Sequence, residues 1–229
     1  MRRIRKGAEP ACLQDLRDTP GTSWSSAHGD EKQAMRDAAF VEQGGLCAYC
    51  MSSLDGRSNS DVKMEHYIAR GTAQGKDLLF QWSNLLGVCL GVVGIAADDR
   101  SPSPDERFHC DTYRGSADLY VHPAVFPPDA GGLFSYTIAG EIRPATNLSP
   151  TRAAEVQKTI DNLNLNIDRL KRNRAGCLEA QRAALRARPK RARVRELLQD
   201  AQRPDPNGRL MPYCQVAVAY LERKLRQMS

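Results

Sequence analysis

The sequence has few aromatic residues and no long apolar run. Phe, Trp and Tyr make up only 6% of its 229 residues, and no stretch is apolar over the length that a membrane-spanning helix needs. The charged start, Met1–Lys6, resembles the first part of a secretory signal, but no apolar segment follows it before Glu9. These absences argue against membrane and secreted proteins, so we expect a cytoplasmic protein with no membrane partner.

The sequence also lacks the even number of cysteines that a secreted disulfide framework favours, because it has seven. Cys47 and Cys50 have instead the Cys-x-x-Cys spacing of a pair of metal ligands. In a reducing compartment these thiols remain available to a metal ion. The formal charge of +6 suits a polyanionic partner such as nucleic acid, but a basic soluble protein without that partner is about as common.

The first half of the chain predicts an arm, a helix and short strands. Residues 1–29 are rich in Pro, Gly, Ser and basic residues, and we interpret them as an arm that Ile4 and Trp24 pack over the core. A helix is expected from Asp30, which can cap it, to Gln43, where two glycines follow. Period-2 patterns and turn signals predict short strands over 62–68, 85–90, 119–121, 134–138 and 141–144.

Residues 91–108 predict a loop between the third and the fourth cysteine of a metal site. The acidic residues of this loop suit a solvated surface better than a second metal site; they are Asp98, Asp99, Asp105 and Glu106.

The second half of the chain predicts helices. An apolar stripe with 4-3-4-3 spacing runs from Val156 to Leu170, and the asparagines at 162, 164 and 166 predict a joint between two helices within it. Further helices are expected over 190–202 and 212–228. This region is strongly basic, which fits a solvated helix face, a contact with phosphates or a docking surface for a partner protein.

Four cysteines can form one structural zinc site. Cys89 and Cys110 would complete a tetrahedral set with Cys47 and Cys50. The gap between the third and fourth ligands is long, so His109 is an alternative to Cys110. A closed set of four thiolates leaves no position for a reactive water, and the chemistry must therefore lie elsewhere.

Two carboxylates and a histidine can form a separate catalytic site. Phosphodiester hydrolysis needs a base and a cation, and His66 is the natural base. Glu65 and Asp111 suit a hard divalent ion, Mg²⁺ or Mn²⁺. Neighbours on a strand point to opposite faces, so Glu65 and His66 can share a site only at a strand end or bend. Asn84 is expected to hold the backbone of His66 or the following loop in place.

These motifs resemble the HNH (ββα-metal) endonucleases, with the order Cys-x-x-Cys, Asp/Glu-His, Asn-Leu, Cys and Cys-Asn/His-x-x-Lys. Residues 44–50, 65–68, 83–91 and 109–115 look more closely like the HNH subunit of Septu-type antiphage systems, including those attached to retrons. Residues 3–10 and 163–174 also match that subfamily. Two positions depart from the family pattern: Asp111 stands where relatives have Asn or His, and Arg114 where they have Lys.

The resemblance implies a role for each matched residue. His66 would be the general base, Glu65 and Asp111 the ligands of the catalytic metal, and Asn84 the structural middle residue of the motif. The four cysteines would hold zinc. Arg114 could contact a phosphate, and the basic region suggests the same for Lys171, Arg172 and Arg174.

The fold class that follows is α+β: a zinc-stapled ββα-metal core with an N-terminal helix and a mostly helical C-terminal region. We predict an arm and helix over 1–45, the nuclease core over 46–128, and a hairpin with a basic helical region over 129–229. The predicted function is cleavage of nucleic acid in antiphage defence, with phage DNA as the first substrate and RNA as the alternative, together with an ATPase subunit. A zinc-containing binding module that does not cut is the competing hypothesis.

Overall fold

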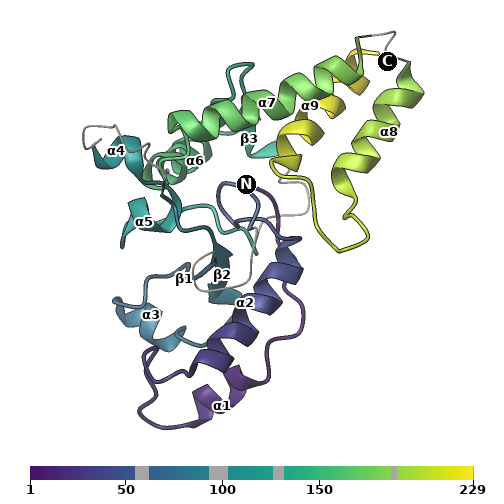
Figure 1. Ribbon diagram of the computed structural model, residues 1–229. Helices are drawn as coiled ribbons and strands as arrows, with labels where there is room; N and C mark the ends of the chain where they lie inside the picture. The colour runs from purple at the N-terminus through teal and green to yellow at the C-terminus, as the bar shows by residue number, and fades with distance from the viewer. Residues whose placement is uncertain (55–61, 93–102, 126–131, 187–189, 229) are drawn as a thin grey trace, which may run out of the picture.

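The computed structural model describes residues 1–54, 62–92, 103–125, 132–186 and 190–228. Over these residues, two small two-stranded sheets accompany a larger number of helices (Figure 1). The predicted mixture of helices and strands is therefore confirmed. No helix within the described ranges has the length and apolar character needed to cross a membrane.

Two helices begin the chain, α1 (Cys12–Asp18) and α2 (Gly29–Gln43). The expected cap of α2 at Asp30 was wrong. The N-cap residue is His28, which forms a capping box with Glu31, and Asp30 already lies in the first turn of the helix. The expected stop was right. Gly44 adopts a left-handed conformation with φ of 62°, and its N–H binds the last carbonyls of α2.

The first sheet pairs β1 (Lys63–His66) with β2 (Leu85–Val88) in antiparallel fashion. Both strands are shorter than predicted, and α2 packs against both of them. The connection between them contains α3 (Ala73–Asp77) and a 3-10 turn, η1 (Trp82–Asn84). Helix α2 therefore lies beside the first sheet (Figure 1).

Two short helices follow the sheet, α4 (Pro104–Arg107) and α5 (Cys110–Arg114). Residues 91–108 were predicted to be a loop throughout, and this prediction missed α4. A capping box formed by Ser103 and Glu106 stabilises the start of this helix. Asp98 and Asp99 lie outside the described residues. The strand expected over 119–121 is absent from the described structure, although its Leu119 and Val121 are buried.

The second sheet is the predicted hairpin of β3 (Phe134–Tyr136) and β4 (Ile142–Pro144). Its turn contains Gly140, with φ of 79°. A Cβ atom at this position would lie 2.0 Å from the carbonyl oxygen of Lys171, so only glycine lets the hairpin approach the helix that contains Lys171.

Four helices complete the chain: α6 (Pro150–Asn162), α7 (Asp168–Ala184), α8 (Arg191–Gln202) and α9 (Cys214–Gln227). The predicted joint lies between α6 and α7, and the apolar stripe that crosses it is buried. Helix α9 packs against α7 and α8, and the three form one layer of the molecule (Figure 1).

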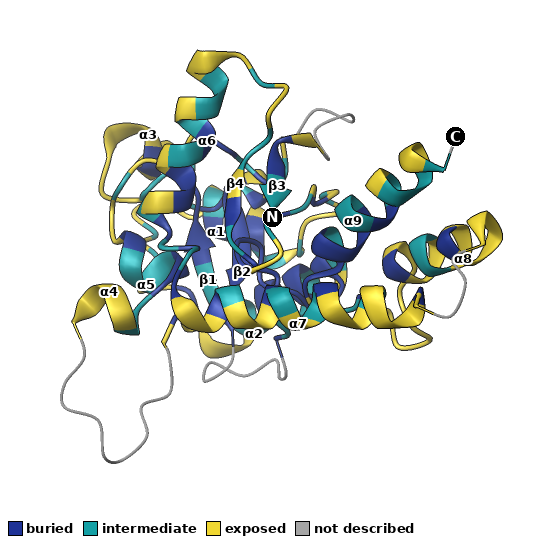
Figure 2. Cartoon of the chain, turned by 90° about the horizontal axis from the view of Figure 1, so that it is seen from above, coloured by how far each residue is buried: buried dark blue, intermediate teal, exposed yellow. Residues whose placement is uncertain are grey.

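A single apolar cluster joins residues from Met1 to Val216 and therefore connects both halves of the chain. Buried residues gather where the first sheet, α7 and α9 meet, and the outer faces of the helices are exposed (Figure 2). The arm packs as expected. Ile4 is 2% exposed, and Trp24 packs against Phe80 beside α2.

Candidate active site and metal centre

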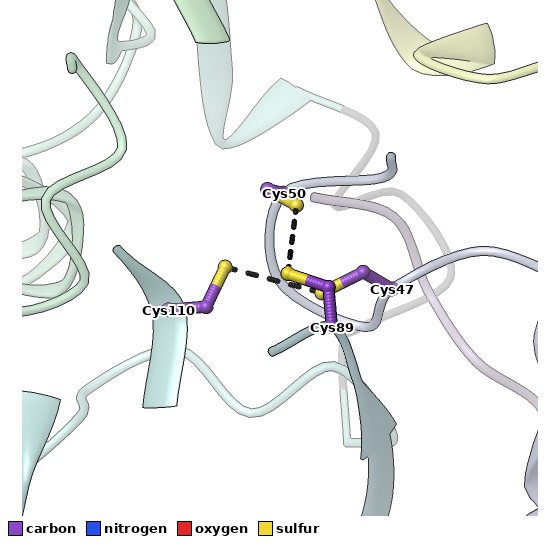
Figure 3. A group of neighbouring side chains, drawn as sticks. All are labelled: Cys47, Cys50, Cys89 and Cys110. Atoms are coloured by element: carbon purple, nitrogen blue, oxygen red, sulfur yellow. Dashed lines mark hydrogen bonds between the residues drawn. The ribbon is translucent and has the colours of Figure 1, made fainter. Parts of the chain in front are cut away.

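Four cysteines from three separate segments meet in the core (Figure 3). Cys47 and Cys50 lie in a tight turn directly after α2, which the bridge between Leu46 and Ser53 closes. Cys89 follows β2, and Cys110 begins α5. Their sulfur atoms all lie within 4.8 Å of one another, so the predicted set of ligands is brought together.

The spacing of the sulfur atoms fits zinc. The Sγ atoms of Cys47 and Cys110 are 3.9 Å apart, and those of Cys50 and Cys89 are 3.8 Å apart. A tetrahedral site with Zn–S bonds of about 2.3 Å requires about 3.8 Å between sulfurs. Hydrogen bonds from Cys110 and Cys47 hold the pKa of the Cys50 thiol well below its usual value, whereas burial and the neighbouring thiols raise the pKa of Cys110. A metal ion would be needed to hold all four sulfurs as thiolates.

The long gap between Cys89 and Cys110 is closed by the backbone. The N–H of His109 donates to the carbonyl oxygen of Gly91 at 2.8 Å, and Val92 forms a bridge with Phe108. This pairing brings the two ends of the loop together beside the cluster. The Nδ1 atom of His109 lies 3.2 Å from the Sγ atom of Cys110, so His109 adjoins the four-cysteine cluster while Cys110 belongs to it.

A cleft of about 530 Å³ opens beside the first sheet, and Glu65, His66 and Asp111 all line it. His66 is the last residue of β1, which is where the alternation of side chains between the two faces ends. The two neighbours therefore share a site at a strand end, as the sequence required. Asp111 reaches the cleft from α5, next to Cys110 of the cysteine cluster.

His66 is held in a fixed orientation and is neutral. Its Nε2 atom lies 2.9 Å from the carbonyl oxygen of Leu79, which can only accept a hydrogen bond, so Nε2 carries the proton and Nδ1 carries the lone pair. The indole of Trp24 meets the imidazole edge to face, with ring centres 4.5 Å apart. Burial lowers the pKa of His66 to about 4, which keeps the imidazole neutral at physiological pH.

Glu65 and Asp111 form a pair of acidic groups in the same cleft. Burial, then a hydrogen bond and the charge of Asp111, raise the pKa of Glu65 to about 8, against the lowering influence of Arg114. Arg114 forms an ion pair with Glu65, and the Nζ atom of Lys63 lies 3.2 Å from a carboxylate oxygen of Asp111. Two adjoining carboxyl groups are the donor set that a hard divalent ion prefers.

Asn84 is buried and holds the loop that follows β1. Its Oδ1 atom accepts a hydrogen bond from the N–H of Ile68 at 2.7 Å, and its Nδ2 atom donates to the carbonyl oxygens of Ile68 and Leu78. The expected structural contact of this residue is therefore present. It acts on the loop that carries Leu79, the partner of His66.

Two of the four basic residues predicted to contact nucleic acid are unsuited to that task. Arg174 is 1% exposed and donates to the carbonyl oxygens of Gly140 and Leu165. Arg114 is 5% exposed and is bonded to Glu65 and to carbonyl oxygens, including that of Tyr67 at 2.7 Å. Because both guanidinium groups are already used inside the protein, we correct these two assignments.

The other two basic residues, Lys171 and Arg172, lie on the outer side of α7, and Lys171 pairs with Asp168. Both stay predictions. Several further residues that line the cleft were missed by the sequence analysis, and they are Trp24, Lys32, Arg36, Lys63 and Arg70. One signal in the sequence could have indicated Lys32 and Arg36. The helix that contains them leads directly into Cys47, so one face of this helix must lie beside the core.

Comparison with known proteins agrees with the motifs. No family model matches the chain. The chain is 29% identical over 199 residues to a protein of Escherichia coli assigned as an HNH endonuclease of retron Ec83, and the match covers 74% of this chain and 76% of that protein. The similarity confirms the predicted resemblance to retron-associated HNH endonucleases, and it supports an HNH endonuclease.

Proposed function

We propose that the protein is a metal-dependent HNH endonuclease that hydrolyses phosphodiester bonds of nucleic acid, with DNA as its first substrate. One observation carries this proposal: a neutral, oriented imidazole and a pair of carboxyl groups line the same cleft. Phosphodiester hydrolysis needs a base and a cation site beside each other, and a protein that only binds nucleic acid needs neither.

His66 would act as the general base. Its Nδ1 atom carries the lone pair because Nε2 donates to Leu79, and it would take the proton of the attacking water. Trp24 and the loop that Asn84 holds keep the ring in this orientation. The lowered pKa keeps the imidazole neutral at physiological pH, so Nδ1 presents its lone pair.

Glu65 and Asp111 would hold the catalytic Mg²⁺ or Mn²⁺, which would neutralise charge on the phosphate and on the leaving oxygen. Glu65 is oriented by Arg114, and Asp111 is oriented by Lys63. Asp111 also follows Cys110 directly, so a zinc ion in the cysteine cluster would fix the position of the second carboxylate.

The cleft is lined by β1 and by Asp111 of α5, and β1 pairs with β2. This arrangement supports a ββα-metal core within 46–128, with 1–45 and 129–229 packed around it. We further propose a role in antiphage defence together with an ATPase subunit. The support for this role is the retron named for the Escherichia coli relative and the resemblance of the motifs to Septu-type subunits.

The test compares His66→Ala with the wild type on plasmid DNA and on total RNA, with Mg²⁺ or Mn²⁺. We expect cleavage by the wild type and a loss of about 100-fold or more in the variant, because a positioned base contributes about that much. Zinc content should be unchanged, since His66 lies outside the cysteine cluster. The matched control is His122→Gln, because His122 is also a histidine with a pKa lowered to about 4 by burial, and it lies outside the cleft.

Two results would contradict the proposal. Cleavage by His66→Ala at the wild-type rate would show that the base is another group. Binding without cleavage by the wild type in every divalent metal, with and without the ATPase subunit, would favour a zinc-containing binding module. Cleavage of RNA alone would keep the enzyme class and change the substrate.

A further inference from the structure

We propose that Arg36 and Lys32, on the side of α2 that faces the cleft, bind a backbone phosphate of the nucleic acid next to the bond that is cut. This inference rests on the proposed nuclease function, for which it supplies a binding site. It places the main phosphate contact on the N-terminal helix, far in sequence from the basic C-terminal region.

Arg36 and Lys32 form one wall of the cleft. They are four residues apart on α2 and therefore lie on the same side of the helix. Both line the cleft that Glu65, His66 and Asp111 also line. A phosphate held on this wall would bring the neighbouring phosphodiester bond to the histidine and the carboxyl groups.

Arg36 is a buried cation whose guanidinium is hydrogen-bonded to a neutral side chain. The residue is 5% exposed, and it forms no ion pair among the residues that the structure describes. Its Nε and Nη2 atoms donate to the side-chain oxygen of Gln33 at 3.2 and 2.9 Å. Within the same described ranges its Nη1 atom has no hydrogen-bond partner.

The other two buried arginines among the described residues have more bonding partners than Arg36. Arg114 is paired with Glu65, and Arg174 is bonded to carbonyl oxygens and to the side chain of Asn166. Burying a charge without an ion-pair partner is costly, and a bound anion would offset that cost. Burial lowers the pKa of Arg36, and the charge of the neighbouring Asp37 offsets this effect only in part.

A phosphodiester is the anion that suits this wall. The guanidinium plane can donate two parallel hydrogen bonds to the two free oxygens of a phosphate. Lys63 and Arg70 add positive charge at the same cleft, and the two acidic groups there are the proposed metal ligands. With a divalent ion bound to those carboxylates, the cleft would carry a net positive field that attracts a polyanion.

The experiment measures binding separately from cleavage. A short fluorescein-labelled DNA duplex is titrated with His66→Ala protein, and fluorescence anisotropy is followed over a series of KCl concentrations. Adding Arg36→Met or Lys32→Met should weaken binding about tenfold and make the slope of log K against log salt shallower by about 0.9, the value for one lost phosphate contact. Arg36→Lys should recover part of the affinity because it keeps the charge.

The control is Arg143→Met in the same His66→Ala protein. Arg143 is an exposed arginine on β4 that pairs with Glu141, and it should leave affinity and slope unchanged. Zinc content and circular dichroism show whether each variant is folded. Lys32 is only partly buried, so Lys32→Met should still fold. If Arg36→Met does not fold, Lys32→Met is the variant that tests the phosphate site.

The inference would be overturned if Arg36→Met bound DNA with the affinity and the salt slope of the parent. The same result in Lys32→Met would overturn it where Arg36→Met does not fold. The absence of any DNA binding by the parent would also overturn it. Failure of the nuclease proposal gives a different result. A wild type that binds DNA and never cuts it would refute the catalytic roles, while a weakened, less salt-sensitive Arg36→Met would still support the phosphate site.

Discussion

Among the described residues, three arginines are buried, and their surroundings give them different tasks. Arg114 joins α5 to β1 through Glu65 and the carbonyl oxygen of Tyr67, so it orients a proposed metal ligand. Arg174 joins α7 to the hairpin and to the joint between α6 and α7. Arg36 donates to the side chain of Gln33 and forms no ion pair within the described ranges, which leaves part of its guanidinium available to a ligand.

The role of Arg174 can be tested at the residue scale. Arg174→Met should lower the free energy of unfolding by about 1–3 kcal/mol, because it leaves the buried carbonyl oxygens of Gly140 and Leu165 without a donor. The measurement is urea denaturation followed by circular dichroism. Arg172→Met is the matched control, since Arg172 is an exposed arginine on the same helix and should change stability by less than about 0.5 kcal/mol. Equal stability of the two variants would contradict the structural role.

Helix α2 is the element that connects the two sites. Its first half supplies Lys32 and Arg36 to the cleft, and its end leads into the turn of Cys47 and Cys50. Gln43, at the last position of the helix, donates to the carbonyl oxygens of Leu46 and Gly87 at 2.7 Å and accepts from the N–H of Gly87 at 2.8 Å. One buried amide therefore fastens the helix, the cysteine turn and β2 together.

Removal of this amide should loosen the contact between these elements. Gln43→Ala should lower the free energy of unfolding by about 1–3 kcal/mol, because the buried N–H of Gly87 loses its acceptor. Thermal unfolding and zinc content are the measurements, and zinc should be lost more readily to a chelator. Val41→Ala is the control, since Val41 lies on the same helix and is 68% exposed. A Gln43→Ala protein as stable as this control would show that the amide is dispensable.

At the scale of the whole molecule, the cysteine cluster joins three segments that are far apart in the sequence. Cys47 and Cys50 follow α2, Cys89 follows β2, and Cys110 begins α5. Asp111, the neighbour of Cys110, reaches the cleft. A zinc ion in the cluster would therefore stabilise the core and also set the distance between Asp111 and Glu65.

Zinc removal should abolish activity by disturbing the fold. A zinc-selective chelator should lower the melting temperature and stop cleavage, and Mg²⁺ added alone should not restore it, because Mg²⁺ prefers oxygen ligands. Added zinc should restore both. Cys110→Ser should lose zinc, whereas Cys12→Ser should keep it, since Cys12 lies on α1 outside the cluster. Cleavage at the normal rate by zinc-free protein would show that the cluster is not needed for the site.

The sequence by itself determined the elements whose signals are local. The glycine stop after α2, the hairpin turn at Gly140 and the joint between α6 and α7 follow from backbone preferences of single residues, and the structure contains all three. The cysteines of the sequence also predicted the four thiols that meet in the core, with His109 left as an alternative to Cys110. The sequence also required a strand end or bend at Glu65 and His66, and β1 ends at His66, two residues before the predicted end of the strand.

Only the tertiary structure decided which charged residues face the cleft and which are buried. In the sequence, Arg172 and Arg174 belong to the same basic run, yet one is exposed and the other lies in the core. Likewise, nothing in the sequence distinguishes Arg36 from an exposed arginine of an amphipathic helix. Its burial results from the packing of α2 against the first sheet. The reason is physical: the cost of burying a charge and the partner that offsets it depend on neighbours that are distant in the chain.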